Sequence, residues 1–226
     1  MIKKLMEIHI GDTTVYLTTT HVALICVSIF LIVFALIANR VLLKADPDAT
    51  PGMFQNFLEI ITDMLGGMVD GLMGTNAKRF VNYISSIFLF ILICNLGGLF
   101  GLRAPTADYG VTLPLALFTF VLIHYNGIKK KKGKHFLALF EPIPLFFPIN
   151  LISEVATPLS LSIRLFGNVM SGTVLMGLVY AMFPLFIQIV PIPGIMHIYF
   201  DVFSGAIQTY VFCMLTMVYI NDKISD

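Results

Sequence analysis

The amino-acid sequence predicts an all-α, polytopic membrane protein. We expect about five membrane helices, an amphipathic helix on the cytoplasmic side, and a long, tilted helical hairpin at the C-terminal end. Hydrophobic residues make up 58% of the 226 residues and charged residues only 12%, whereas a soluble domain is about 45–50% apolar and about 25% charged. The apolar residues gather into runs long enough to cross a bilayer, which takes about 20 helical residues. We therefore interpret residues 1–226 as a single integral membrane domain.

Polar residues separate the apolar runs and so predict the elements in order. The first run follows a polar lead, residues 1–21, and ends without a small-residue cleavage site, so we expect an uncleaved first span. Pro51 suits the first turn of the next helix. The expected elements are a first span at 22–43, an amphipathic helix at 52–74, spans at 80–102 and 111–126, a basic loop at 127–140, a long helix at 145–183 and a last helix at 195–221.

Segment 52–74 does not read as a span. Phe57, Ile61 and Leu65 recur at helical spacing, and Gln55 and Glu59 take the other face. This pattern predicts a helix that lies at the membrane interface or against a neighbouring protein.

The helix expected at 145–183 is too long to cross the bilayer upright. At 1.5 Å per residue it measures more than about 50 Å, against about 30 Å for the hydrocarbon core. It must tilt strongly, kink or lie partly along the membrane plane. The prolines Pro191 and Pro193 then turn the chain into the last helix, which we expect to run antiparallel to it.

Lysine and arginine fall mainly on one side of the bilayer if the spans alternate. Arg40 and Lys44, Lys78 and Arg79, and the run Lys129–Lys132 share that side. The positive-inside rule then places the N-terminus outside and the C-terminus in the cytoplasm. We expect a multi-pass protein of the cell membrane.

Arg164 is the most informative residue of the chain. The run from Leu145 to Phe186 carries only one other formal charge, Glu154. A permanent cation near a bilayer centre costs about 2.5–3.5 kcal/mol on insertion scales, and its usual explanation is function. Snorkelling to the headgroups is disfavoured because about three apolar turns follow Arg164 before Pro184. Polar residues continue its face of the helix at three- or four-residue steps: Asn150, Ser153, Thr157, Ser160, Asn168 and Ser171.

The last helix offers a matching set of polar residues. Counting from the proline turn, Gln208 could reach the level of Arg164 in an antiparallel hairpin, and Asp201 lies nearer the outer end. Asp201 is a candidate ionisable group for an outer aqueous pocket, and Glu154 is one for an inner pocket. A fixed cation between two such pockets would stop ions from leaking straight through.

Three segments resemble one family. The run SLSIRLFGNVMSG at 160–172 resembles the signature of subunit a of the F-type ATP synthase, and AIQTYVFCMLTMVYI at 206–220 resembles its last helix. EPIPLFFPINLISE at 141–154 resembles the approach to the helix before. The resemblance covers the whole chain.

The resemblance implies the ion-translocating stator subunit of a rotary ATP synthase, which is not an enzyme on its own. It implies that Arg164 separates two offset half-channels and pairs in turn with the carboxylates of a ring of c subunits. Asn168 matches the signature asparagine, Gln208 the glutamine near the arginine, and Glu154 a glutamate of the cytoplasmic half-channel. Further partners would be the peripheral-stalk b subunits and the lipid bilayer. The transported ion would be a proton, the more common case, or sodium.

Two positions depart from the family pattern. Many members have a glutamate nine residues after the arginine, where this chain has Thr173, and a histidine seven residues before the glutamine, where it has Asp201. The outer carboxylate would thus have moved from one helix of the hairpin to the other. We expect Asp201, and not Thr173, to be the outer relay.

Other functional classes fit less well. A secondary transporter predicts an inverted internal repeat, but the charged face occurs once. An intramembrane enzyme needs a nucleophile–base pair or a metal cluster, and no HxxxH or HExxH spacing is present, so we expect no catalytic residue, metal or cofactor. A scaffold with a stray arginine leaves the paired polar faces unexplained. A net charge of +1 gives no surface for nucleic acid.

Overall fold

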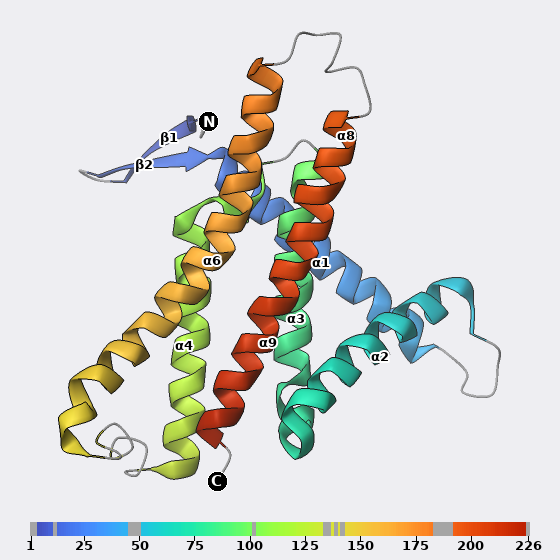
Figure 1. The fold of residues 1–226 in the computed structure, drawn as a ribbon. Coiled ribbons are helices and arrows are strands. Elements are labelled where there is room, and N and C mark those ends of the chain that lie inside the picture. Colours follow the sequence, from blue (N-terminus) through green and yellow to red (C-terminus); the bar gives the residue numbers. More distant parts are fainter. Residues whose placement is uncertain are drawn as a thin grey trace. The chain divides into compact units, whose positions relative to one another are not determined.

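The computed structural model describes residues 4–10, 13–44, 51–100, 103–132, 137, 140, 143–182 and 192–224. Helices dominate it (Figure 1). Within these residues, five helical segments are long and apolar enough to cross a membrane, which confirms the predicted all-α membrane fold. The main helices are α1 Thr19–Leu43, α2 Met53–Met73, α3 Ala77–Leu96, α4 Tyr109–Lys131, α6 Phe147–Met182, α8 Ile192–His197 and α9 Gly205–Ile224.

Shorter elements join these helices. They are the 3-10 turns η1 Gly74–Asn76, η2 Gly97–Phe100, η3 Pro105–Ala107 and η5 Pro144–Phe146, and a π-helical segment, η6 Ile198–Ser204, between α8 and α9. The π-helix was not predicted. Such segments occur frequently at functional sites, and η6 contains Asp201.

A small antiparallel hairpin precedes the first span, where the sequence analysis expected only a polar lead. Strands β1 Lys4–Ile10 and β2 Thr13–Thr18 pair with Glu7 opposite Tyr16 and Ile8 opposite Val15. The second strand carries Thr13, Thr14 and Val15, residue types that favour extended structure. The hairpin is therefore an addition to the predicted helical fold.

The chain divides into two compact units, Met1–Cys94 and Asn95–Asp226. In the first unit, Leu58, Leu65 and Val69 of α2 are buried at helical spacing, whereas Phe54 and Phe57, predicted on the same apolar face, are exposed. Helix α1 is exposed along most of its length. An apolar helix that buries so little within its own chain is suited to contact with lipid or with other subunits.

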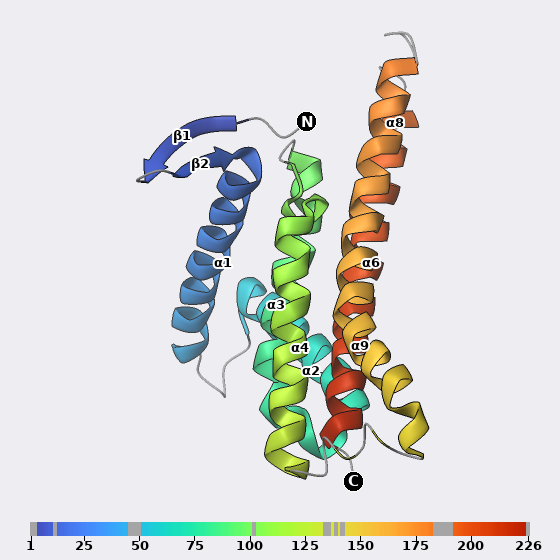
Figure 2. The same ribbon diagram turned by 90° about the vertical axis from the view of Figure 1, so that its left-hand side faces the viewer.

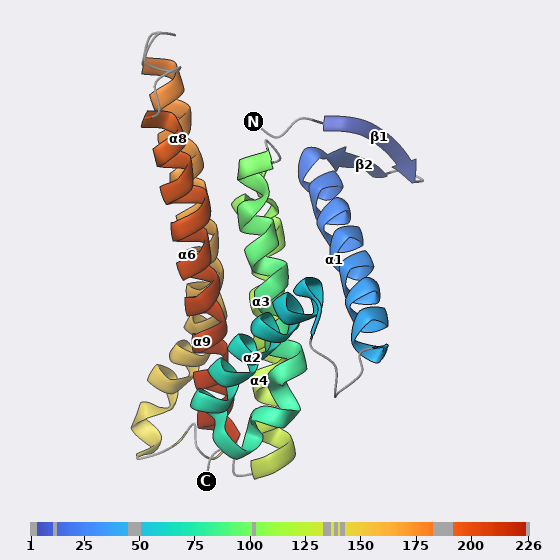
Figure 3. The same cartoon turned by 90° about the vertical axis from the view of Figure 1, so that its right-hand side faces the viewer.

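In the second unit, α4 packs against α6 and α9, and α6 packs against α9. Figures 2 and 3 show α6 beside the continuous run of α8, η6 and α9, so the predicted antiparallel hairpin is present. Helix α6 has 36 residues and contains Pro158. Its first turns slant away from the rest (Figure 1), as expected where a proline removes a helical hydrogen bond.

Several boundaries differ from the prediction. The third span was expected at 111–126, but α4 continues to Lys131 and takes in the first lysines of the predicted basic loop. Lysines are good helix formers and are favoured at a helix C-terminus, where the macrodipole is negative. The last helical run begins at Ile192 rather than at 195. Residues 183–191, where the sequence predicts a turn, and most of the predicted loop after residue 132 lie outside the described residues.

Two glycines set how closely the hairpin and its neighbours approach. A Cβ atom built on Gly172 would lie 3.3 Å from Cβ of Phe200, and one on Gly205 would lie 3.0 Å from Cβ of Asn95. Because these contacts are between atoms next to the backbone, a side chain at either glycine would push two elements apart.

We expect Gly205→Ala to destabilise the protein, because crowding a packed contact costs about 1–3 kcal/mol. Gly177→Ala in α6 is the matched control, since its added Cβ would meet nothing within 4 Å, and it should be neutral or slightly stabilising. Thermal unfolding of the detergent-solubilised complex measures the difference. Equal melting temperatures for the two variants would contradict the packing argument.

Candidate functional site

Two contacts fix the register between α6 and the last helical run. Asn168 Nδ2 donates to the backbone oxygen of Ser204 at 3.2 Å, and Ser204 Oγ donates to Asn168 Oδ1 at 2.8 Å. One turn further along, Gly172 meets Phe200. Arg164 is four residues before Asn168, and Gln208 is four residues after Ser204. The antiparallel register therefore places Arg164 and Gln208 at the same level.

The two side chains at this level have different environments. Gln208 is buried, and its Nε2 has no hydrogen-bond partner among the described residues. Arg164 is exposed, and within the described part of the chain it makes no hydrogen bond or ion pair. The structure thus brings the two residues level without a bond between them. An unpaired guanidinium on an apolar helix is costly in a membrane, and such residues usually have a function.

Asp201 belongs to a hydrogen-bonded chain of three side chains near the C-terminal end of α6. Asp201 Oδ2 lies 2.7 Å from His197 Nδ1, one helical turn earlier, and His197 Nε2 lies 3.1 Å from the hydroxyl oxygen of Tyr180 on α6. Both imidazole nitrogens are therefore engaged. One nitrogen of a neutral imidazole donates and the other accepts, so this ring connects the phenol to the carboxylate.

Gly98 in η2 makes room for the Asp201 carboxylate. A Cβ at Gly98 would lie 3.0 Å from Asp201 Oδ2 and 3.1 Å from its Cγ. Any side chain at Gly98 would displace the acid or be displaced by it.

Asn95 fastens this region to α9. Its Nδ2 donates to the backbone oxygen of Gly205 at 3.0 Å and to Thr209 Oγ1 at 3.2 Å, and its Oδ1 accepts from Thr106 at 2.6 Å. Asn95, Thr106 and Thr209 are all buried. A satisfied buried network of this kind holds its elements in one arrangement, so it fixes the position of η6 and Asp201.

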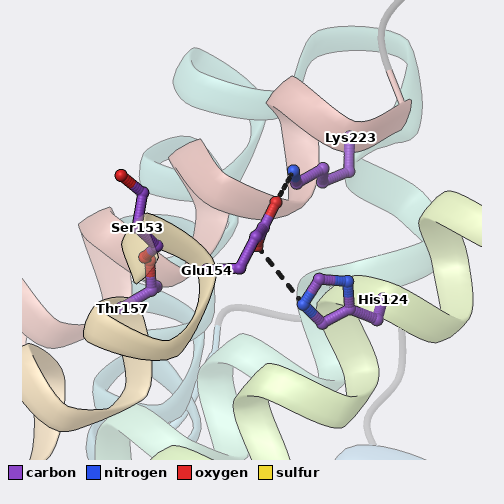
Figure 4. Close-up of polar contacts among 5 residues, drawn as sticks. All are labelled: His124, Ser153, Glu154, Thr157 and Lys223. Atoms are coloured by element: carbon purple, nitrogen blue, oxygen red, sulfur yellow. Dashed lines mark hydrogen bonds and ion pairs between the residues drawn. The ribbon is translucent and has the colours of Figure 1, made fainter. Parts of the chain in front are cut away.

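Glu154 forms a second cluster, near the N-terminal end of α6 (Figure 4). Its Oε1 accepts a hydrogen bond from Lys223 Nζ, and its Oε2 lies 3.4 Å from His124 Nε2 on α4. A cavity of about 170 Å³ adjoins the cluster, and Ser153, Thr157, Tyr219 and Asp222 contribute to its lining. The cluster thus joins α4, α6 and α9 beside a pocket with both polar and apolar lining residues.

Known proteins match the chain over most of its length. The sequence model of the family described as ATP synthase A chain matches residues 20–221. This chain belongs to that family.

Individual relatives agree with the assignment. The ATP synthase subunit a of Listeria welshimeri is 37% identical over 217 residues, 89% of this chain and 88% of the relative. A protein of Propionigenium modestum named ATP synthase subunit a, sodium ion specific, is 41% identical over 196 residues, 79% of this chain but 66% of the relative. The chloroplastic subunit a of Stigeoclonium helveticum is 35% identical over 207 residues, 86% of this chain and 80% of the relative.

Membership of the family fixes the general role. An ATP synthase subunit a is the ion-translocating stator subunit of the complex, so this multi-pass membrane protein works within a larger assembly. Among the described residues, no group of three or more His, Cys, Asp or Glu side chains could hold a metal ion.

The subunit a site also contains residues that sequence reasoning did not select. His124, His197 and Lys223 contact the candidate acids directly, and Tyr180 extends one of the chains. The spacing of His197 and Asp201, four residues apart on one helix, was a usable signal. No sequence spacing indicates that α4 and α9 bring His124 and Lys223 to Glu154.

Thr173 plays no part in these clusters. Its hydroxyl donates to the backbone oxygen of Val169 on its own helix at 2.9 Å, a common arrangement for threonine in membrane helices.

Proposed function

We propose that α6 and α9 of this subunit a form two offset half-channels separated by Arg164, which passes ions to and from the carboxylates of the c ring and so couples ion flow to ring rotation. The subunit catalyses no reaction itself. The observation that carries the proposal is the exposed, unpartnered guanidinium of Arg164, level with Gln208 and between two separate acid clusters.

The positions of the acids along α6 support two half-channels rather than one continuous path. By the register of the hairpin, Asp201 is level with about residue 171 of α6, seventeen residues from Glu154. This separation is about 25 Å along a helix, and Arg164 lies between the two levels. An ion entering at one acid would therefore meet a fixed positive charge before it reached the other.

Arg164 would act on the ring by electrostatics. A nearby permanent cation favours the ionised form of a carboxylate, so a ring carboxylate that arrives at Arg164 would release its ion. The exposed guanidinium can form the paired hydrogen bonds that a carboxylate accepts. Gln208, at the same level, would orient either group, and Asn168 would hold α6 against η6 one turn away.

The orientation follows from the basic end of the second unit. Lys129–Lys131 end α4, on which His124 contacts Glu154, so the positive-inside rule assigns Glu154 to the cytoplasmic half-channel and Asp201 to the outer one. The N-terminus would lie outside and the C-terminus in the cytoplasm of a cell membrane. Peripheral-stalk b subunits would hold this stator against the ring.

Two ions are candidates. Protons suit a hydrogen-bonded chain such as Tyr180–His197–Asp201, because each member can give up and accept a proton. The relative from Propionigenium modestum, 41% identical, is named sodium ion specific, and this favours sodium as the second candidate.

We expect Arg164→Ala to reduce ATP-driven ion pumping in membrane vesicles to background, while the subunit still inserts and assembles. Arg40→Ala, which removes a cation at the end of α1, is the control and should pump normally. ATP-driven acidification of the vesicles with and without sodium identifies the ion. Robust pumping by the Arg164 variant would overturn the proposed function.

We expect Asp201→Asn to slow transport much more than Thr173→Ala does. The asparagine keeps the shape but not the ionisable group, whereas Thr173 bonds only to its own helix. Initial pumping rates at equal amounts of assembled complex give the comparison. Equal effects would remove Asp201 from the outer path.

We also expect Gly98→Ala to slow transport, because its Cβ would press on the Asp201 carboxylate. Gly97→Ala is a closely matched control, since the neighbouring position has nothing within 4 Å of an added Cβ. The same pumping assay applies. If both variants behave like the unaltered complex, the position of Asp201 against Gly98 does not matter for transport.

A further inference from the structure

We propose that Lys223 is a tethered cation that competes with the transported ion for the Glu154 carboxylate and so gates the cytoplasmic half-channel. This inference rests on the proposed placing of Glu154 in that half-channel. It assigns a role to two residues, Lys223 and His124, that the proposed function leaves unused.

The carboxylate of Glu154 is engaged at both oxygens. Oε1 accepts from Lys223 Nζ, and Oε2 faces His124 Nε2 at 3.4 Å. Figure 4 shows the lysine and the histidine reaching Glu154 from two different helices. An ionised carboxylate can only accept hydrogen bonds, so an arriving cation would compete with these two groups for its oxygens.

The ion pair between Lys223 and Glu154 can break readily. The side chains of Lys223 and Glu154 are 26% and 20% exposed, so water and ions reach the pair. Ion pairs that water can reach are weak. Lys223 lies in the last turn of α9, which ends at Ile224, and its ammonium sits on a flexible four-carbon stem. The ammonium can leave without a change in the fold.

His124 is held more firmly and has a different role. Its ring packs edge-on against Phe120 with the centroids 4.1 Å apart. The histidine therefore positions the second oxygen of Glu154, while the lysine occupies the first.

The adjoining cavity can hold an ion beside Glu154. Its volume of about 170 Å³ corresponds to about five water molecules at about 30 Å³ each. Ser153, Thr157, Tyr219 and Asp222 are among the residues that line it. A hydrated cation in this cavity lies beside Glu154 and can take the place of the ammonium. The lysine would then set the ion concentration at which the half-channel fills.

The test uses inverted membrane vesicles that contain the complete ATP synthase, in which the cytoplasmic face is outside and ATP-driven pumping draws ions past Glu154. Pumping rates are measured against external sodium at fixed pH, and against pH at minimal sodium, so that the two ions are distinguished. We expect Lys223→Gln to lower the half-saturating concentration of the transported ion several-fold. Lys223→Arg, which keeps the charge, should leave it near that of the unaltered protein.

Matched variants separate competition from a general loss of charge or packing. Lys129→Gln removes a cation from the last turn of α4 and should have no effect on half-saturation. In a Glu154→Gln background, Lys223→Gln should cause no further shift. If the glutamine variant is lost from the membrane, Lys223→Met replaces it, because it keeps an unbranched apolar stem.

An unchanged half-saturation in the assembled Lys223→Gln or Lys223→Met variant would overturn the inference, as would an equal shift in Lys129→Gln. Arg164→Ala, measured in the same vesicles, keeps the two hypotheses apart. Loss of pumping in that variant together with an unchanged half-saturation in the Lys223 variants would refute the gate and leave the proposed function standing.

Discussion

The register between α6 and the last helical run is the constraint on which the candidate site depends. It is held by the reciprocal hydrogen bonds of Asn168 and Ser204 and by the close approach of Gly172 to Phe200. A shift of one turn would carry Gln208 away from the level of Arg164 and would change which residues face Asp201. The asparagine of the family signature therefore has a structural explanation in this chain: its amide both donates and accepts across the hairpin, which a hydrophobic residue could not do.

The charged side chains of the second unit differ in whether they have a partner from their own chain. Glu154 and Asp201 have nitrogen partners from their own chain, whereas Arg164 has none among the described residues. Satisfying every charge internally would give the more stable isolated subunit, because an unpaired charge in a membrane is costly. Leaving Arg164 without such a partner is consistent with the proposed site, which carboxylates of the c ring would complete.

The sequence predicted those parts of the molecule that depend on local pattern. Apolar runs predicted the spans, the excess length of 145–183 predicted the distortion that Pro158 introduces, and the cost of a buried cation singled out Arg164. It did not predict contacts between distant helices. His124 and Lys223 are thirty residues before and sixty-nine residues after Glu154, and only the packing of α4 and α9 against α6 brings them there. The π-helical segment was missed for a related reason: an extra residue in a helical turn leaves no periodic signal in seven residues.

Packing also explains how a carboxylate is accommodated at position 201. A carboxylate at Asp201 needs space on the side of η2, and Gly98 supplies it by having no side chain. It also needs a polar partner in an apolar setting, and His197 supplies one from the preceding turn. At position 173, by contrast, the hydroxyl is satisfied by its own backbone. A carboxylate at this place thus depends on three positions together, Gly98, His197 and Asp201. An aspartate introduced at 201 into a relative with a bulky residue opposite it would be excluded from this place by steric conflict, whatever its charge.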